Sequence, residues 1–336
     1  MMAHHDHLTV AGAQIAPIWL DRDRTLDKVL DWVQRAASRG AELVAFGECL
    51  VPGYPFWLER TDGARFESAR QKALHAHYLD QAVQLEAGHL DRLATAAADL
   101  HCAVVLGCYE RPRDRGGHSG YASAIVITPD GTIQPPHRKL VPTYEERLVW
   151  GAGDGHGLRT YPLGPFTVGA LNCWENWMPL PRAALYGMGE DLHIALWPGS
   201  TRNTAEITRF LAREGRSYVL SVSGLMRDVD VPDHLPHVDL LRSTSDAVMA
   251  NGGTCLAGPD AAWVVEPMEG SEALLLATIE HRRVREERQN FDAAGHYSRP
   301  DVTRLVVDRT RQATVELQDS PPRARTVTRD ESRRSD

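Results

Sequence analysis

Apolar positions in the first fifty residues follow two different periods. Residues 8–15 form an apolar run of the length and character of a strand that is buried on both faces. Between residues 25 and 38 apolar side chains recur at spacings of three and four, which predicts an amphipathic helix, and Gly40 is placed to end it. Residues 43–47 form a second apolar run. A strand, a helix and a strand over about 40 residues predict a βαβ unit with a parallel strand pair.

The rest of the chain mixes further helical and strand-like patterns. Residues 66–100 are helical in pattern and rich in alanine, and two helices broken near Gly88 are expected there. Asn203 and Glu206 resemble a capping box that opens a helix ending at Arg213. Shorter helices are expected at residues 145–149 and 181–188. Further strands are expected at residues 103–109, 123–128, 166–171, 192–197, 218–223, 253–256, 262–266, 273–279 and 305–307.

This succession of elements predicts an α/β protein of the α+β type, in which βα alternation is combined with adjacent strands. No break in composition divides the chain, so a single domain is expected over residues 1–317. Residues 318–336 are polar and charged and contain two consecutive prolines, and a disordered tail is expected there.

Composition excludes several classes of function. Hydrophobic content of 43% and charged content of 24% are ordinary for a globular protein, and no apolar stretch approaches the roughly 18 residues needed to span a bilayer. Residues 1–7 lack the apolar core of a secretory signal, so a cytoplasmic protein with no membrane partner is expected. A net charge of -8 disfavours a nucleic-acid-binding surface, which needs clustered Lys and Arg. A small-molecule partner is expected instead.

Cysteine and histidine spacing argues against a metal site. The five cysteines contain no C-x-x-C pair, so neither a disulfide framework nor a zinc cage is indicated. The densest group of histidines, at His4, His5 and His7, lies at the N-terminus without the i, i+4 pairing of a zinc-binding helix. We therefore expect no metal.

Cys173 is the candidate nucleophile because of its position in the chain. It directly follows the predicted strand at 166–171 and one asparagine, and ligands of open α/β sheets bind at the carboxyl ends of strands. A buried cysteine more often serves as a small hydrophobic residue, so the case depends on its partners. Glu48 follows the second predicted strand, and Lys139 lies in the long loop after the fourth. Glu48 can accept the thiol proton and Lys139 can hold the thiolate, although an ion pair at the rim of a sheet is the alternative interpretation.

Three motifs in the same order as these residues resemble the nitrilase family, a branch of the carbon-nitrogen hydrolases. They are Phe46-Gly47-Glu48 with Pro52-Gly53-Tyr54-Pro55, His137-Arg138-Lys139-Leu140-Val141-Pro142-Thr143 with Glu146-Arg147, and Asn172-Cys173-Trp174-Glu175-Asn176 with Met178-Pro179-Leu180. A C-terminal element, Gly295-His296-Tyr297-Ser298-Arg299-Pro300-Asp301, is also similar. The resemblance implies a four-layer αββα sandwich and homodimers that assemble further into spirals or filaments.

The same resemblance implies roles for four residues. Glu48, Lys139 and Cys173 would form the catalytic triad, and Glu146 would be a second glutamate that orients Lys139 and the substrate nitrogen. The implied reaction converts an organic nitrile to a carboxylic acid and ammonia through a cysteine thioimidate and an acyl-enzyme, without a metal or an organic cofactor. For Glu146 the alternative is a solvated helical carboxylate, because its neighbours Glu145 and Arg147 are charged.

The chain departs from the family after the strand at 192–195, where a proline is common and this sequence has Leu196-Trp197-Pro198-Gly199-Ser200. We expect Trp197 to line the acyl pocket together with Tyr54 and Trp174, and packing in the core is the alternative for Trp197. Residues 224–239 have no counterpart that can be matched.

Several other functions fit the same residues. An amidase, a carbamoylase or a cyanide-degrading enzyme would use the same triad, and a catalytically silent assembly protein would retain only the fold. A Cys-His hydrolase would need a partner such as His156 or His193.

Overall fold

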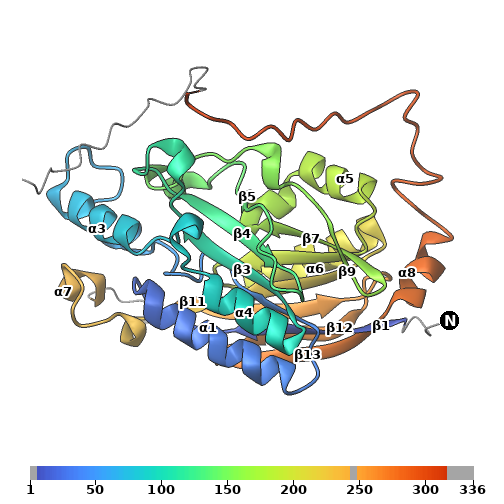
Figure 1. The fold of residues 1–336 in the computed structure, drawn as a ribbon, viewed down its shortest axis with the longest axis horizontal. Coiled ribbons are helices and arrows are strands. Elements are labelled where there is room, and N and C mark those ends of the chain that lie inside the picture. The colour runs from blue at the N-terminus through green and yellow to red at the C-terminus, as the bar shows by residue number, and fades with distance from the viewer. Residues whose placement is uncertain (1–5, 243–247, 316–336) are drawn as a thin grey trace, which may run out of the picture.

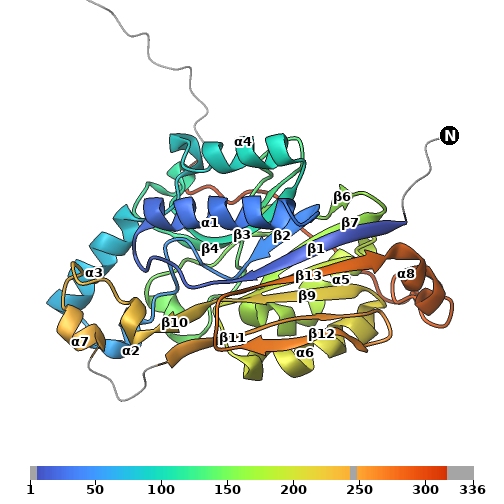
Figure 2. The same ribbon diagram turned by 90° about the horizontal axis from the view of Figure 1, so that it is seen from below.

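The structure, a computed structural model, describes residues 6–242 and 248–315 as two stacked β-sheets with helices on their outer faces (Figures 1 and 2). The first sheet has the strand order β13-β1-β2-β3-β4-β5. The second has the order β10-β11-β9-β8-β7-β6, and β12 pairs with β11. Residues 318–336, the expected disordered tail, lie outside the described residues.

The elements have the following bounds. The first sheet contains β1 His7–Gln14, β2 Leu43–Phe46, β3 Ala103–Glu110, β4 Tyr121–Ile127, β5 His137–Arg138 and β13 Ala273–Glu280. The second contains β6 Tyr161–Leu163, β7 Phe166–Asn172, β8 Leu192–Trp197, β9 Tyr218–Ser223, β10 Leu225–Arg227, β11 Val248–Ala257 and β12 Trp263–Glu269. The α-helices are α1 Arg22–Ala37, α2 Trp57–Arg60, α3 Ala69–Asp80, α4 Asp91–Leu100, α5 Pro179–Gly187, α6 Thr201–Gly215, α7 Val238–Arg242 and α8 His281–Arg288. Single-turn 3₁₀ helices include η3 Tyr144–Leu148 and η5 Cys173–Trp177.

The βαβ prediction for the first fifty residues is confirmed. Asp21 caps α1 by accepting a hydrogen bond from the backbone N–H of Arg24, and the apolar stripe of the helix buries Val29 and Val33. β1 and β2 pair in parallel, with Val10 opposite Leu43.

The main core lies between the two sheets. Side chains such as Leu43, Leu220 and Leu256 are completely buried there, and each contributes about 1.5–3 kcal/mol relative to an exposed position. The helices α1 and α4 cover the outer face of the first sheet, and α5 and α6 cover the outer face of the second (Figure 2). The arrangement is the predicted αββα sandwich. None of the helices in the described part of the chain has the length and apolarity that crossing a membrane requires.

The two sheets approach each other very closely at Gly47. A Cβ atom at this residue would lie 2.7 Å from the carbonyl oxygen of Trp197 and 2.9 Å from the backbone nitrogen of Gly224. The next backbone N–H, that of Glu48, donates to the Trp197 carbonyl at 3.1 Å. Glycine therefore allows the carboxyl end of β2 in one sheet to be hydrogen-bonded to the carboxyl end of β8 in the other.

Three local predictions are wrong. Asn203 does not cap a helix, because α6 already begins at Thr201 and the Asn203 side chain instead donates to the carbonyl of Gly199. The strand expected at residues 305–307 does not form, since this segment is exposed and pairs with no strand among the described residues. The long loop expected from residue 137 begins only at Lys139, because His137 and Arg138 form β5, a two-residue strand too short to be recognised from its pattern.

Candidate active site

The carboxyl ends of three strands place reactive side chains at one point. Glu48 follows β2 and Lys139 follows β5 in the first sheet, whereas Cys173 follows β7 in the second. All three are buried, and Glu146 from η3 joins them. The ligating atoms of Glu48, Glu146 and Cys173 lie within 4.8 Å of one another. The structure therefore brings together the four residues that the sequence singled out.

Cys173 lies at a sharp turn from strand to helix. Its φ angle is 47°, in the left-handed region that non-glycine residues rarely adopt. Such backbone strain is frequent at functional sites, where the surrounding structure maintains it. The backbone N–H of the next residue, Trp174, lowers the pKa of the Cys173 thiol by stabilising its charged form. The turn thus presents the thiol together with a backbone donor.

Lys139 connects the two carboxylates. Its Nζ atom lies 2.8 Å from Oε1 of Glu48 and 2.7 Å from Oε2 of Glu146, and it is 5.4 Å from the centre of the Trp150 ring. Burial lowers the pKa of Lys139, but the charges of Glu48, Cys173 and Glu146 outweigh burial and raise the pKa above its usual value. The side chain is therefore a stable ammonium ion.

Glu48 and Cys173 compete for a proton. Burial raises the pKa of Glu48 to about 8; the Lys139 charge opposes this shift and the Glu146 charge adds to it. Burial, followed by the Glu48 charge, also raises the pKa of the Cys173 thiol, which Lys139 lowers. The resting thiol is protonated, and Glu48 is a base whose pKa suits proton transfer near neutral pH.

Glu146 is held in place by three donors. Besides Lys139, the backbone N–H of Thr143 donates to Oε2 at 2.6 Å and the hydroxyl of Tyr54 donates to Oε1 at 2.8 Å. The Glu146 side chain is buried, so the alternative of a solvated carboxylate is wrong. Glu145, the neighbouring candidate, makes no ion pair with Lys139 among the described residues.

The donor atoms of Glu48, Glu146 and Cys173 would also suit a metal ion. The Lys139 ammonium, however, already contacts both carboxylates and supplies the positive charge between them. A metal ion would have to displace it, so the arrangement fits thiol chemistry better than metal catalysis.

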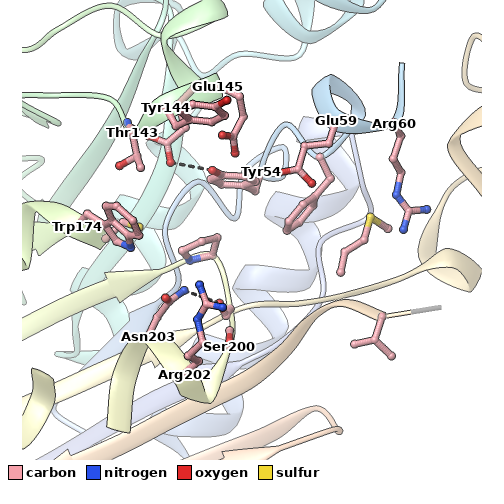
Figure 3. Close-up of a pocket in the computed structure, with 17 residues that line it drawn as sticks. Tyr54, Glu59, Arg60, Thr143, Tyr144, Glu145, Trp174, Ser200, Arg202 and Asn203 are labelled. Carbon is pink, nitrogen blue, oxygen red and sulfur yellow. Dashed lines mark hydrogen bonds between the residues drawn. The ribbon is translucent and has the colours of Figure 1, made fainter. Parts of the chain in front are cut away.

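Cys173 and Glu146 lie in the wall of an open cavity of about 760 Å³ (Figure 3). Tyr54 and Trp174 line it, and their role in an acyl pocket stays a prediction. The other side chains that the figure labels are Glu59 and Arg60 of α2, Thr143, Tyr144 and Glu145 near η3, and Ser200, Arg202 and Asn203 at the start of α6. The cavity wall is thus largely polar and includes the thiol.

Trp197 does not line this cavity, and the expectation that it does is wrong. Its side chain is completely buried in an apolar cluster with Ile207 and Leu211 of α6, and its indole N–H donates to the Ser221 hydroxyl at 3.2 Å. The alternation of side chains along β8 directs Trp197 to the outer face of the sheet, under α6. The alternative of a core role is correct.

The candidate histidine partners are engaged elsewhere. His193 lies between Glu190 and Asn176, and Nδ1 of His156 lies 3.1 Å from the carbonyl of Arg309. Neither has a hydrogen bond to Cys173 among the described residues.

Sequence reasoning gave no role to Glu175 and His137. The Glu175 carboxylate accepts hydrogen bonds from His137 Nε2 and from the backbone N–H groups of Leu140 and Asn172. Both residues lie within the recognised motifs, next to or near Lys139 and Cys173, but only the stacking of the two sheets brings them into contact.

Known proteins resemble this chain over most of its length. The family model described as carbon-nitrogen hydrolase matches residues 9–289. The chain belongs to the carbon-nitrogen hydrolase family. This membership confirms the resemblance in the sequence, and the αββα fold and the thiol site of this carbon-nitrogen hydrolase agree with it.

Several relatives match this carbon-nitrogen hydrolase over nearly its whole length. An aliphatic nitrilase of Sinorhizobium fredii (strain HH103) is 35% identical over 307 residues, which cover 91% of this chain and 97% of that relative. A nitrilase of Pseudomonas syringae pv. syringae (strain B728a) is 35% identical, with 94% of both chains covered. An arylacetonitrilase of Macrophomina phaseolina (strain MS6) is 32% identical over 92% of this chain and 93% of its own.

A solved structure shares the fold at lower sequence identity. The crystal structure of an amidase from Nesterenkonia sp. has a TM-score of 0.61 and 17% identity, and the match covers 84% of this chain and 94% of the amidase. At that identity the likeness supports the sandwich architecture alone.

Proposed function

We propose that this carbon-nitrogen hydrolase is a nitrilase, which converts an organic nitrile to a carboxylic acid and ammonia. The observation that carries the proposal is Lys139, held between Glu48 and Glu146 beside the Cys173 thiol in the wall of an open cavity. The names of the relatives, aliphatic nitrilase, nitrilase and arylacetonitrilase, support the same activity.

In the first step the thiol proton of Cys173 passes to Glu48 as the sulfur attacks the nitrile carbon. The C≡N triple bond becomes a C=N double bond, and negative charge develops on the nitrogen. The Lys139 ammonium and the backbone N–H of Trp174 stabilise that charge. The proton taken up by Glu48 then passes to the nitrogen by way of Lys139, which gives a neutral thioimidate bound to Cys173 and returns Glu48 to its carboxylate form.

Two molecules of water complete the reaction. The first, deprotonated by Glu48, adds to the thioimidate carbon, and the tetrahedral intermediate expels ammonia to leave a thioester. The second hydrolyses the thioester, releases the carboxylic acid and returns the proton to the sulfur. Glu146 keeps Lys139 beside the nitrogen throughout, because it holds the ammonium at 2.7 Å and is itself fixed by Tyr54 and Thr143.

The test is turnover of a panel of aliphatic, aromatic and arylaceto nitriles, with ammonia, acid and amide quantified separately. Ammonia and acid in equal amounts are expected from at least one nitrile, and Cys173→Ala is expected to abolish both products while retaining the folded state. Turnover of amides with no ammonia from any nitrile would contradict the proposal.

An amidase is the second candidate, because the same thiol, base and cation can hydrolyse an amide. The fold shared with the Nesterenkonia amidase is compatible with it. Assembly into homodimers and then spirals or filaments stays a prediction, testable by sedimentation and electron microscopy. The cytoplasmic location also stays a prediction, testable by fractionation of cells.

A further inference from the structure

A chain of buried polar side chains lies behind Cys173, and the thiol chemistry described above does not use it. Asn176 donates through Nδ2 to the carbonyl oxygen of Cys173 at 2.8 Å and to that of Leu171 at 3.3 Å. Its Oδ1 atom lies 2.7 Å from Nε2 of His193, and Nδ1 of His193 lies 2.8 Å from Oε1 of Glu190. Asn176, His193 and Glu190 are all buried.

The directions of these hydrogen bonds are determined by what each atom can do. Nδ2 of Asn176 faces two carbonyl oxygens, so it must be the amide nitrogen, and Oδ1 must be the acceptor that faces His193. His193 therefore donates from Nε2. On its other side one proton lies between Nδ1 and the Glu190 carboxyl group, whichever of the two atoms holds it. The donors thus run in one direction from Nε2 of His193 through Asn176 to the Cys173 carbonyl, and Glu190 fixes the other ring nitrogen of His193.

The end of this chain bears directly on catalysis. The carbonyl of Cys173 and the N–H of Trp174 belong to one planar peptide group, so a hydrogen bond that fixes the oxygen also fixes the direction of the N–H on the opposite side. That N–H is the donor that lowers the pKa of the Cys173 thiol. A hydrogen bond to the carbonyl also polarises the peptide and makes its N–H a stronger donor.

We propose that Glu190, His193 and Asn176 are positioning residues that aim and polarise the Trp174 N–H toward the charge that develops on the substrate. The proposal rests on the thiol chemistry of the proposed function and applies equally to a nitrile or an amide. It also explains how Cys173 maintains a φ angle of 47°, because both carbonyls next to its turn are held by one side chain.

The neighbouring strand β7 leaves room for the Glu190 carboxyl group only because residue 169 is glycine. A Cβ atom at Gly169 of β7 would lie 2.0 Å from Oε1 of Glu190, the oxygen that faces His193. Gly169 lies four positions before Cys173, on the strand that ends directly before it, so β7 itself leaves room for the hydrogen-bonded side chains behind Cys173.

The experiment compares three variants with a matched control. Asn176→Asp retains an acceptor for His193 but has no N–H to donate to the Cys173 carbonyl. His193→Leu removes the donor, and His193→Gln can restore it through its amide. The control, His281→Leu, removes a histidine–carboxylate pair of the same 2.8 Å length, with Asp191, and His281 has no hydrogen bond to Glu190, His193 or Asn176 among the described residues.

Three measurements are made on each variant that melts cooperatively. They are kcat and KM with the best nitrile or amide substrate, and the pH dependence of Cys173 alkylation by iodoacetamide, followed by mass spectrometry of the Cys173 peptide. We expect kcat to fall about 10- to 100-fold in Asn176→Asp and His193→Leu with KM nearly constant, and to recover partly in His193→Gln. Alkylation should shift to higher pH in the first two, because a weakened Trp174 donor stabilises the thiolate less. His281→Leu should change neither kcat nor the alkylation profile.

Equal kcat values and equal alkylation profiles in His193→Leu and His281→Leu, with similar losses in melting temperature, would overturn the proposal and leave Glu190, His193 and Asn176 a purely structural role. If Asn176→Asp does not fold, the two His193 variants decide the question. Alkylation requires no substrate, so the proposal stays testable even if no nitrile is hydrolysed.

Discussion

The Glu175 carboxylate accepts a hydrogen bond from His137 Nε2 at 2.9 Å, and this contact joins the two sheets. His137 belongs to β5 of the first sheet, and Glu175 follows β7 of the second. The same carboxylate accepts from the backbone N–H groups of Leu140 and Asn172, which flank Lys139 and Cys173 respectively. One buried side chain therefore fixes the position of the ammonium relative to the thiol.

Replacing Glu175 by Gln is expected to damage both stability and catalysis. The amide nitrogen of Gln would face an N–H donor, so we expect a loss of about 1–3 kcal/mol in the free energy of unfolding and a large fall in kcat. Denaturant unfolding and steady-state kinetics measure the two effects. A variant with wild-type kcat would show that this carboxylate does not set the distance between Lys139 and Cys173.

The stabilisation by Glu175 should depend on pH. Burial raises the pKa of Glu175, but the His137 charge and the hydrogen bonds outweigh burial and hold the pKa below the usual value of 4.5. Its stabilisation is therefore present above pH 4.5 and is lost as the pH falls through the lower, folded-state pKa. The difference in unfolding free energy between wild type and Glu175→Gln should shrink below pH 4.5. A difference that grew with acid would contradict this assignment.

The pH profile of turnover should follow Glu48. Because Glu48 must be ionised to accept the thiol proton, kcat/KM for an uncharged substrate should rise with pH, reach half its maximum near the Glu48 pKa of about 8 and level off above it. The negative charge of Glu146 raises that pKa, so in Glu146→Gln the rise should move to lower pH, at a lower maximal rate. An unmoved or oppositely moved profile would argue against this coupling.

Lys139 should be essential for folding stability as well as for turnover. Lys139→Gln would leave two buried carboxylates without a cation, and we expect a loss of about 3–5 kcal/mol in unfolding free energy. The control is Lys72→Gln, which removes an exposed ion pair with Glu67 and should cost less than about 1 kcal/mol. Equal losses in the two variants would show that the buried pairs contribute no more than the exposed one.

Substrate choice should depend on Trp174 and Tyr54 and not on Trp197. Trp174→Ala and Tyr54→Phe alter the cavity wall, so the order of kcat/KM values across the nitrile panel should change. Trp197→Phe should lower the melting temperature, because it loses packing under α6 and the bond to Ser221, and should leave that order unchanged. A changed order of kcat/KM values in Trp197→Phe would show that Trp197 does influence substrate choice.

The sequence predicted much of this site because strand ends are visible as ends of apolar runs. Glu48 and Cys173 were found in that way. The position within the Lys139 motif selected Glu146, and not Glu145, as the second glutamate. The orientation of Trp197 was not predictable, because β8 is buried on both faces and its apolar pattern does not distinguish them. The contacts of Glu175 with His137 and of His193 with Asn176 were missed because each joins segments that become neighbours only through tertiary structure.

The close approach at Gly47 makes catalysis dependent on cooperative folding. Glu48 and Lys139 belong to one sheet and Cys173 to the other, and the Glu48 backbone is bonded across to Trp197. A partly unfolded molecule with two intact but separated sheets would retain most of its secondary structure and have no complete triad. Turnover should therefore disappear along a denaturant series no later than the circular dichroism signal. The activity of the enzyme would then measure whether the two sheets are packed against each other.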